Sequence, residues 1–172
     1  MIVVNDVLGY KNRKIYQDDN YFKFSIDGVL LANFVKYKLT TKKVLDIGTG
    51  TGIIPLILTM KSDVVVDAIE IQKELVELFT KTIEINNLDK SINLIHDDIR
   101  NYSTKSVNLN KYDIVISNPP YFSKEQNKTI KDNAKHENFL SLEELIIASK
   151  KILKDRGFLY LIYNTARLDE IF

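Results

Sequence analysis

From residue 43 onward, apolar segments of strand length alternate with amphipathic or apolar segments of helix length. Strands that alternate with helices favour a parallel sheet covered by helices on both faces, with right-handed crossovers between the strands. The sequence therefore predicts a three-layer, Rossmann-like α/β fold. The expected strands are 43–47, 64–69, 92–96, 112–117 and 158–163, and the expected helices are 53–60, 73–86 and 142–154.

Two local signals set the limits of the last expected helix. Ser141 is a good N-cap, and Glu144 three residues later completes a capping box. Gly157 is expected to end this helix before the fifth strand begins.

A glycine-rich turn follows the first of these strands. It reads Asp46-Ile47-Gly48-Thr49-Gly50-Thr51-Gly52, and the next helix begins at Ile53. Glycines permit a tight turn and the close approach of a ligand, and the helix N-terminus favours an anionic group. A dinucleotide fingerprint places glycines at the first, third and sixth positions, whereas here the sixth position is Ile53. A turn that binds no ligand is the alternative.

Acidic residues follow the second and third strands. Glu70 ends the second strand, twenty residues after Gly50, where a carboxylate can accept the two hydroxyls of a ribose. Its alternative role is that of a surface acid at a strand end. Asp97 and Asp98 follow the third strand, and we prefer Asp98 as a site residue because it directly precedes the apolar Ile99.

The fourth strand ends in Asn118-Pro119-Pro120-Tyr121. Two prolines remove two backbone donors, fix two φ angles and push the preceding residues out of the helical region. The result is a stiff, extended turn that presents the Asn118 side chain and backbone carbonyls as hydrogen-bond acceptors for a planar amine. An ordinary strand-ending turn is the alternative.

Four features follow one another along the chain, namely the turn at 46–52, Glu70, Asp98 and the turn at 118–121. Their order resembles that of the motifs in class I methyltransferases that act on exocyclic amines. A further motif, Ser25-Ile26-Asp27-Gly28, precedes an apolar segment. With this motif included, the chain is most similar to the tRNA(Val) adenine-37 N6-methyltransferase family. Such folds carry seven strands in which the first five have the order 3-2-1-4-5. The resemblance implies that the last two strands are missing from this chain.

The resemblance also implies S-adenosylmethionine as the cofactor and tRNA as the substrate. Asp46 would face the cofactor's ammonium group, and Asp98 would accept from the exocyclic amine of its adenine ring. Ile71 and Ile99 would sandwich that ring. The implied cofactor-binding residues are Ser25, Asp27, Asp46, Gly48, Gly50, Gly52, Glu70, Ile71, Asp98, Ile99 and Asn118. For Ser25 and Asp27, an N-cap or loop pair is the alternative.

For the substrate, Asn118 and the Pro119 carbonyl would accept the N–H bonds of the adenine N6 amine. Tyr121 would stack on the unpaired or flipped target base, and Phe122 is either a second platform or a core aromatic. The catalytic residues expected on this basis are Asn118, Pro119 and Tyr121, and the substrate-binding residues are Pro120, Tyr121, Phe122, Lys124 and Lys128. No metal site is expected. The open alternatives are another amine, in rRNA, DNA or a protein glutamine, and a non-catalytic RNA-binding module.

Charge and composition fit these expectations. The net charge is only +1, but residues 1–44 carry an excess of basic side chains, and Lys124, Lys128, Lys131 and Lys135 would form one helical stripe. A nucleic acid could use both regions, although a solvated loop is the alternative for the stripe.

The remaining features concern compartment and domain organisation. Because the chain has no cysteine, no apolar run of membrane-spanning length and no basic signal sequence at its start, we expect a cytoplasmic protein without membrane or metal partners. We expect residues 1–42 to form a cap or lid on the core at 43–172, within the same domain.

Overall fold

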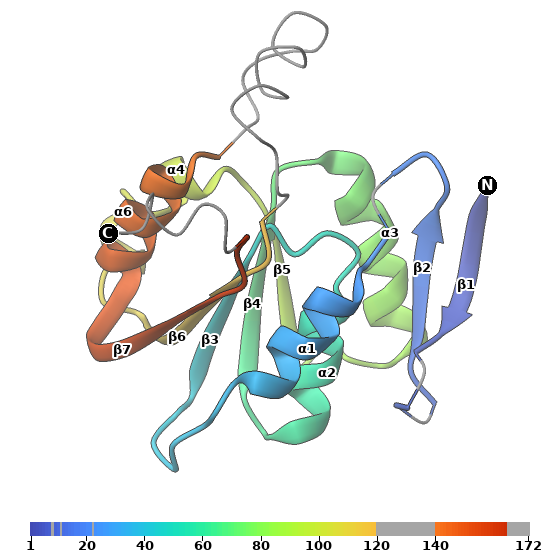
Figure 1. The fold of residues 1–172 in the computed structure, drawn as a ribbon, viewed down its shortest axis with the longest axis horizontal. Helices are drawn as coiled ribbons and strands as arrows, with labels where there is room; N and C mark the ends of the chain where they lie inside the picture. The colour runs from blue at the N-terminus through green and yellow to red at the C-terminus, as the bar shows by residue number, and fades with distance from the viewer. Residues whose placement is uncertain (8, 11, 22, 120–139, 165–172) are drawn as a thin grey trace, which may run out of the picture.

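The computed structural model describes residues 1–119, apart from 8, 11 and 22, and residues 140–164. Its centre is a parallel sheet of five strands with the order β5-β4-β3-β6-β7 (Figure 1). Counted along the core, this is the expected order 3-2-1-4-5, which is therefore confirmed. The strands are β3 (Lys43–Ile47), β4 (Val65–Glu70), β5 (Ile92–His96), β6 (Tyr112–Ser117) and β7 (Leu153–Leu161).

Helices cover both faces of this sheet, and each face has its own apolar cluster. Successive strand residues point to opposite faces, so that Val44 packs in one cluster and Leu45 in the other. The first cluster includes side chains of α1 (Ile26–Phe34), α2 (Ile53–Lys61) and α3 (Lys73–Ile85). The second includes side chains of α4 (Ile99–Tyr102) and α6 (Leu142–Ile152). A short 3-10 helix, η1 (Ser106–Asn108), precedes β6.

The predicted boundaries of the last helix and of the fifth strand were wrong, because that strand, β7, spans Leu153–Leu161 rather than 158–163. Helix α6 ends at Ile152 rather than at residue 154, and β7 begins at once with Leu153. Gly157 lies inside β7, where the pairing with β6 shifts between Tyr112 and Ile114. The chain folds so tightly at this irregularity that a Cβ on Gly157 would lie 2.8 Å from Leu153 and 2.9 Å from the Lys154 carbonyl oxygen. Gly157 therefore permits a bulge rather than ending a helix.

An antiparallel hairpin in the first residues was not predicted. It consists of β1 (Ile2–Asp6) and β2 (Lys14–Asp18), and it lies beside α3 (Figure 1). Ile15 of β2 is fully buried in the same apolar cluster as Val44 and Leu31 of α1. This shared cluster supports the proposal that residues 1–42 belong to the same domain as the sheet.

None of the helices that the structure describes combines the length and the apolar character that crossing a membrane requires.

Candidate active site

The carboxyl ends of β3 and β6 bring two of the predicted motifs together. Ile47 and Ser117 pair in register, so Gly48 and Asn118 follow them side by side at the same edge of the sheet. The Ser117 hydroxyl donates to the Ile47 carbonyl oxygen at 2.9 Å, which fixes the two strand ends against each other. The glycine turn and the Asn118-Pro119 dipeptide are thus neighbours.

The glycine turn depends on left-handed backbone at three positions. Gly48, Gly50 and Gly52 have φ values of 67°, 59° and 92°, which only glycine adopts without strain. A Cβ on Gly52 would lie 2.0 Å from the ring of Phe79 in α3, whereas a Cβ on Gly48 or Gly50 would meet nothing within 4 Å. Glycine is therefore required at position 52 by packing against the core, whereas Gly48 and Gly50 leave space on the outer side of the turn.

Asp46 lies directly before this turn and is fully buried. Neither of its carboxylate oxygens has a hydrogen-bond partner among the described residues. Burial, with a smaller contribution from the nearby Glu70, raises the pKa of Asp46 to about 7, whereas Thr49 opposes the rise without making a hydrogen bond of good geometry. A buried acceptor without a partner is costly, and a cationic group bound at the turn would stabilise its charged form.

Glu70 at the end of β4 supports the turn from the other side. Its Oε2 accepts the Gly50 N–H at 2.9 Å, and its Oε1 accepts the N–H groups of Ile71 and Gln72 at 3.0 Å each. A carboxylate offers about four lone-pair sites, so Glu70 retains acceptor capacity. Its proposed hydrogen bonds to ribose hydroxyls would have to share the carboxylate with the turn.

Asp98 is the N-cap of α4, and Arg100 holds it on both oxygens. The Arg100 guanidinium donates to Asp98 at 2.6–3.0 Å, and the Arg100 backbone N–H donates to Oδ1 at 2.8 Å. Asp97 pairs instead with Lys105 at 2.6 Å. Ile71 is half-buried, whereas Ile99 is buried in the cluster that packs α4 onto the sheet. The roles of Asp98, Ile71 and Ile99 toward an adenine ring remain predictions.

Helix α1 brings the Ser25–Gly28 segment to the same edge. A Cβ on Gly28 would lie 3.0 Å from Ile53 of α2, which is tight, and 3.6 Å from Asn118 Nδ2, which is an ordinary contact distance. Gly28 therefore lies next to Asn118, and its missing side chain makes room for Ile53. Ser25 is the N-cap of α1 by its backbone, yet its side chain makes no capping hydrogen bond. Asp27 lies in the first turn and is half-buried.

Several predicted residues lie outside the part of the chain that the structure describes, namely Pro120, Tyr121, Phe122, Lys124, Lys128, Lys131 and Lys135. Asn118 and Pro119 are the last described residues of their motif, and both are half-buried. Across the described residues, no cluster of three or more His, Cys, Asp or Glu side chains could hold a metal ion.

Sequence reasoning overlooked two residues that the geometry places at the site. Gly28 was read only as part of a motif, although it lies next to Asn118 and its missing side chain makes room for Ile53. Arg100 was not considered, although its spacing of two from Asp98 at a helix start makes it a natural partner for that carboxylate.

The sheet order is that of the Rossmann-like class of α/β folds, in which ligands bind at the carboxyl ends of the strands. Comparisons with solved structures agree. A SAM-dependent methyltransferase from Agrobacterium tumefaciens matches with a TM-score of 0.64 at 16% identity, covering 95% of this chain and 53% of that chain. TYW2 of P. horikoshii, solved in complex with MeSAdo, matches with a TM-score of 0.62 at 17% identity, covering 92% and 50%.

The family model of the methyltransferase small domain matches residues 26–169, and the chain belongs to this family. Its fold is that of the class I, S-adenosylmethionine-dependent methyltransferases.

Curated relatives with higher sequence identity share one enzyme name. The tRNA1(Val) (adenine(37)-N6)-methyltransferase of Christiangramia forsetii is 34% identical over 162 residues, which is 92% of this chain and 67% of the relative. The enzyme of that name from Bacteroides fragilis (strain YCH46) is 32% identical over 150 residues, covering 86% and 62%. The chain therefore spans about two thirds of the length of these relatives.

Proposed function

We propose that this protein transfers a methyl group from S-adenosylmethionine to the N6 amine of an adenine in tRNA, at position 37 of a valine tRNA. The observation that carries this proposal is the in-register placement of Asn118 beside Gly48, with Gly28 of α1 packed against Asn118. A rigid acceptor pair and a ligand-binding turn then share one edge of the sheet. The names and similarity of the curated relatives support the choice of tRNA.

The described residues fit the cofactor. Asp46 offers a buried carboxylate without a partner, which suits the ammonium of the methionine part. Gly48 and Gly50 leave room for close approach. Glu70 ends β4 where a ribose would lie, and Asp98 follows β5 where an adenine would lie. When bound, the cofactor supplies an electrophilic methyl group on a sulfonium.

Catalysis then depends on how the chain holds the amine. The N6 lone pair of adenine is delocalised into the ring, which makes it a weak nucleophile. Asn118 Oδ1 and the Pro119 carbonyl oxygen accept its two N–H bonds and favour a tetrahedral nitrogen whose lone pair is free to attack. Positive charge develops on that nitrogen, and the acceptor dipoles stabilise it. Positioning contributes much of the remainder, and the proton leaves after transfer.

Substitution of Asn118 tests the proposal. We expect Asn118→Ala to lower kcat for methyl transfer by about 10²–10³-fold, the effect of removing one preorganised polar group from a transition state. Calorimetric titration with S-adenosylmethionine should show retained cofactor binding. Asn20→Ala, which removes an amide from an exposed turn, is the matched control. Unchanged turnover in Asn118→Ala would remove this residue from the mechanism.

The substrate is tested separately with tritiated methyl donor on total tRNA, DNA and protein. We expect label in tRNA, and mass spectrometry of its nucleosides should identify N6-methyladenosine. Label in DNA or protein alone would contradict the proposed substrate. We further propose that the protein works in the cytoplasm, the compartment in which tRNA would be available to it.

A further inference from the structure

Exposed aromatic and basic side chains meet between the C-terminal end of α1 and the outer strand β7. We call Phe34, Lys36, Lys38, Arg156, Phe158 and Tyr160 the α1–β7 surface. Phe34 is 68% exposed and Phe158 is 44% exposed. The ring of Tyr160 lies between them, with its centroid 6.1 Å from that of Phe34 and 6.3 Å from that of Phe158. Three rings from two distant segments thus form a continuous row.

Basic groups lie directly on this row. Lys38 Nζ lies over the Phe158 ring, 4.4 Å from its centroid. The Tyr160 hydroxyl lies 3.4 Å from the Lys36 backbone nitrogen, which keeps the α1–β3 connection against β7. Lys38 and Phe158 also line a depression of about 220 Å³ that continues to Lys154 and Arg156.

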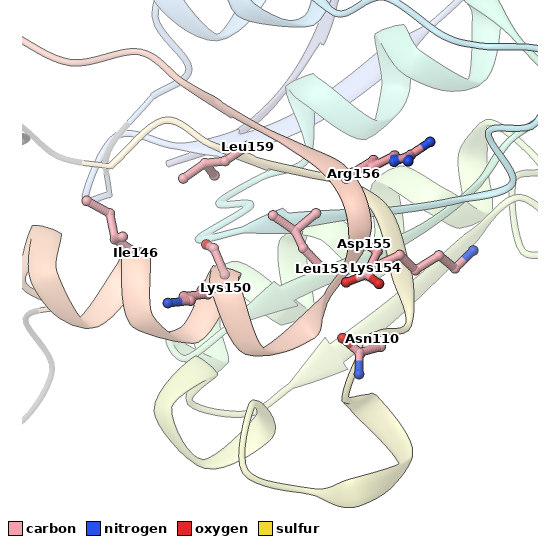
Figure 2. Close-up of a pocket in the computed structure, with 10 residues that line it drawn as sticks. Asn110, Ile146, Lys150, Leu153, Lys154, Asp155, Arg156 and Leu159 are labelled. Carbon is pink, nitrogen blue, oxygen red and sulfur yellow. The ribbon is translucent and has the colours of Figure 1, made fainter.

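A second depression, of about 390 Å³, lies beside the bulge in β7. Figure 2 shows Lys154 and Arg156 reaching out on one side of the bulge and Lys150 on the other. Lys154 and Arg156 thus border both depressions, whereas Lys150 comes from α6.

Few acidic groups offset this charge. Asp113 is engaged by Lys154 at 2.7 Å and by the backbone N–H groups of Lys42 and Lys43 at 3.0 Å. Asp155 is the other acid in the depressions. Within the described part of the chain, no carboxylate pairs with Lys36, Lys38 or Arg156. The surface is consequently positive and partly apolar.

Its position relative to the candidate active site follows from strand pairing. Tyr160 pairs with Ile116, and Leu161 pairs with Ser117, the residue before Asn118. Phe158 pairs with Ile114, which lies four residues before Asn118, or about 13 Å along the strand at ~3.3 Å per residue. One end of the α1–β7 surface thus borders the candidate active site, and the other extends away from it.

We propose that the α1–β7 surface binds the RNA substrate away from the target nucleotide. This inference rests on the proposed function. Lysine and arginine would neutralise phosphates, and the exposed rings would contact bases or sugars by stacking. Lysine is depleted in protein–protein interfaces, and here Lys38 lies over one of the rings. RNA therefore fits this surface better than a second copy of the chain.

The test measures binding of a valine tRNA transcript by filter binding over a range of salt concentrations. We expect the double variant Lys36→Glu/Lys38→Glu to raise Kd by about tenfold or more, and to reduce the slope of log Kd against log salt by about two. Lys90→Glu is the matched control because Lys90 is exposed in the turn before β5, at the opposite edge of the sheet. It should leave Kd within about twofold of the wild-type value. Phe34→Ser, at an exposed position of α1, should weaken binding without changing the salt slope.

Other readouts separate failure of this inference from failure of the proposed function. Titration with S-adenosylmethionine should give the same affinity for wild type and for the double variant. Wild-type methylation of tRNA combined with unchanged Kd in the double variant would overturn this inference alone. No binding of tRNA by a wild type that binds S-adenosylmethionine would overturn both. A wild-type dimer in analytical ultracentrifugation that the double variant converts to a monomer would assign the surface to self-association instead.

Discussion

Folding favours the neutral form of the Asp46 carboxyl, whereas binding of a cationic ligand would favour its charged form. Burial without hydrogen bonds destabilises its charged form, and its pKa rises to about 7 for that reason. A bound cation would favour the charged form. A side chain retained for a ligand at a cost to stability is a common feature of functional sites.

The raised pKa predicts how stability depends on pH. An acid with an ordinary value of 3.8 and a folded-state value of about 7 binds more protons in the folded state between these limits. Its contribution to stability is therefore complete below about pH 4 and is lost as pH rises through about 7. We expect Asp46→Asn to raise Tm at pH 8 by about 2–4 °C, corresponding to ~1 kcal/mol, and to change it little at pH 4 or below.

Two further measurements check this prediction. Asp46→Asn should weaken binding of S-adenosylmethionine at pH 8, because the amide cannot offset a positive charge. Asp67→Asn is unsuitable as a control because Lys111 and Tyr112 bind that carboxylate; Asp63→Asn, at an exposed position, is suitable. A fall in the Tm of Asp46→Asn at pH 8 would show that the carboxylate has a partner in the protein.

At the scale of elements, α6 shows a sequence signal that the structure reproduces in detail. The Ser141 hydroxyl accepts the Glu144 N–H at 3.1 Å, and Glu144 Oε2 accepts the Ser141 N–H at 2.8 Å. The other oxygen of Glu144 lies 3.4 Å from Arg100, the partner of Asp98. The start of α6 is thereby connected to α4.

Removal of the cap should destabilise this element measurably. We expect Ser141→Ala to lower stability by about 1 kcal/mol, or Tm by about 2–4 °C. Ser141→Asp retains an acceptor at the N-cap and should keep Tm close to that of the wild type. Equal losses in both variants, measured by thermal unfolding, would contradict a capping role.

The C-terminal end of the same helix shows why local signals were insufficient. Lys150, Lys151 and Lys154 all favour helix, and no local breaker stands at Leu153. The helix ends because the Asn110 and Lys111 N–H groups donate to the Lys151 and Ile152 carbonyl oxygens, at 3.1 and 2.8 Å. Partners more than forty residues away in sequence therefore fix this boundary.

The site, too, could be predicted only where local sequence and strand order determine its position. The turns at 46–52 and 118–119 could be placed because parallel strands bring their carboxyl ends to one edge. The engagement of Glu70 with three backbone N–H groups depends on side-chain geometry that no pattern encodes. The pair of Asp98 with Arg100 was open to prediction from its spacing at a helix start.

At the scale of the whole molecule, side chains of α3 and of its C-cap residue Asn86 hold the N-terminal hairpin to the core. Asn86 Oδ1 accepts the Lys14 N–H at 2.9 Å, and its Nδ2 donates to the Lys14 carbonyl oxygen at 2.6 Å. Thr82 accepts the Tyr16 N–H at 3.0 Å. These amide and hydroxyl groups take the place of a neighbouring strand along one edge of β2, which explains how a two-stranded hairpin persists here.

Truncation of the Asn86 side chain should destabilise the packing of the hairpin while leaving the sheet unaffected. We expect Asn86→Ala to cost about 1–3 kcal/mol through the backbone groups left without partners. Amide hydrogen exchange should become faster at Lys14 and Tyr16 and stay unchanged in β3. Glu84→Ala, on the exposed side of α3, is the control. Uniformly faster exchange in hairpin and sheet would instead show that the two unfold as one cooperative unit.

The contacts of Glu70 also bear on how the protein would behave between reaction cycles. Since Glu70 holds the glycine turn through the protein's own amides, the turn adopts this conformation without a bound nucleoside. Product departure would then require no refolding of that loop, and the next molecule of methyl donor would meet a receptor already in its working conformation.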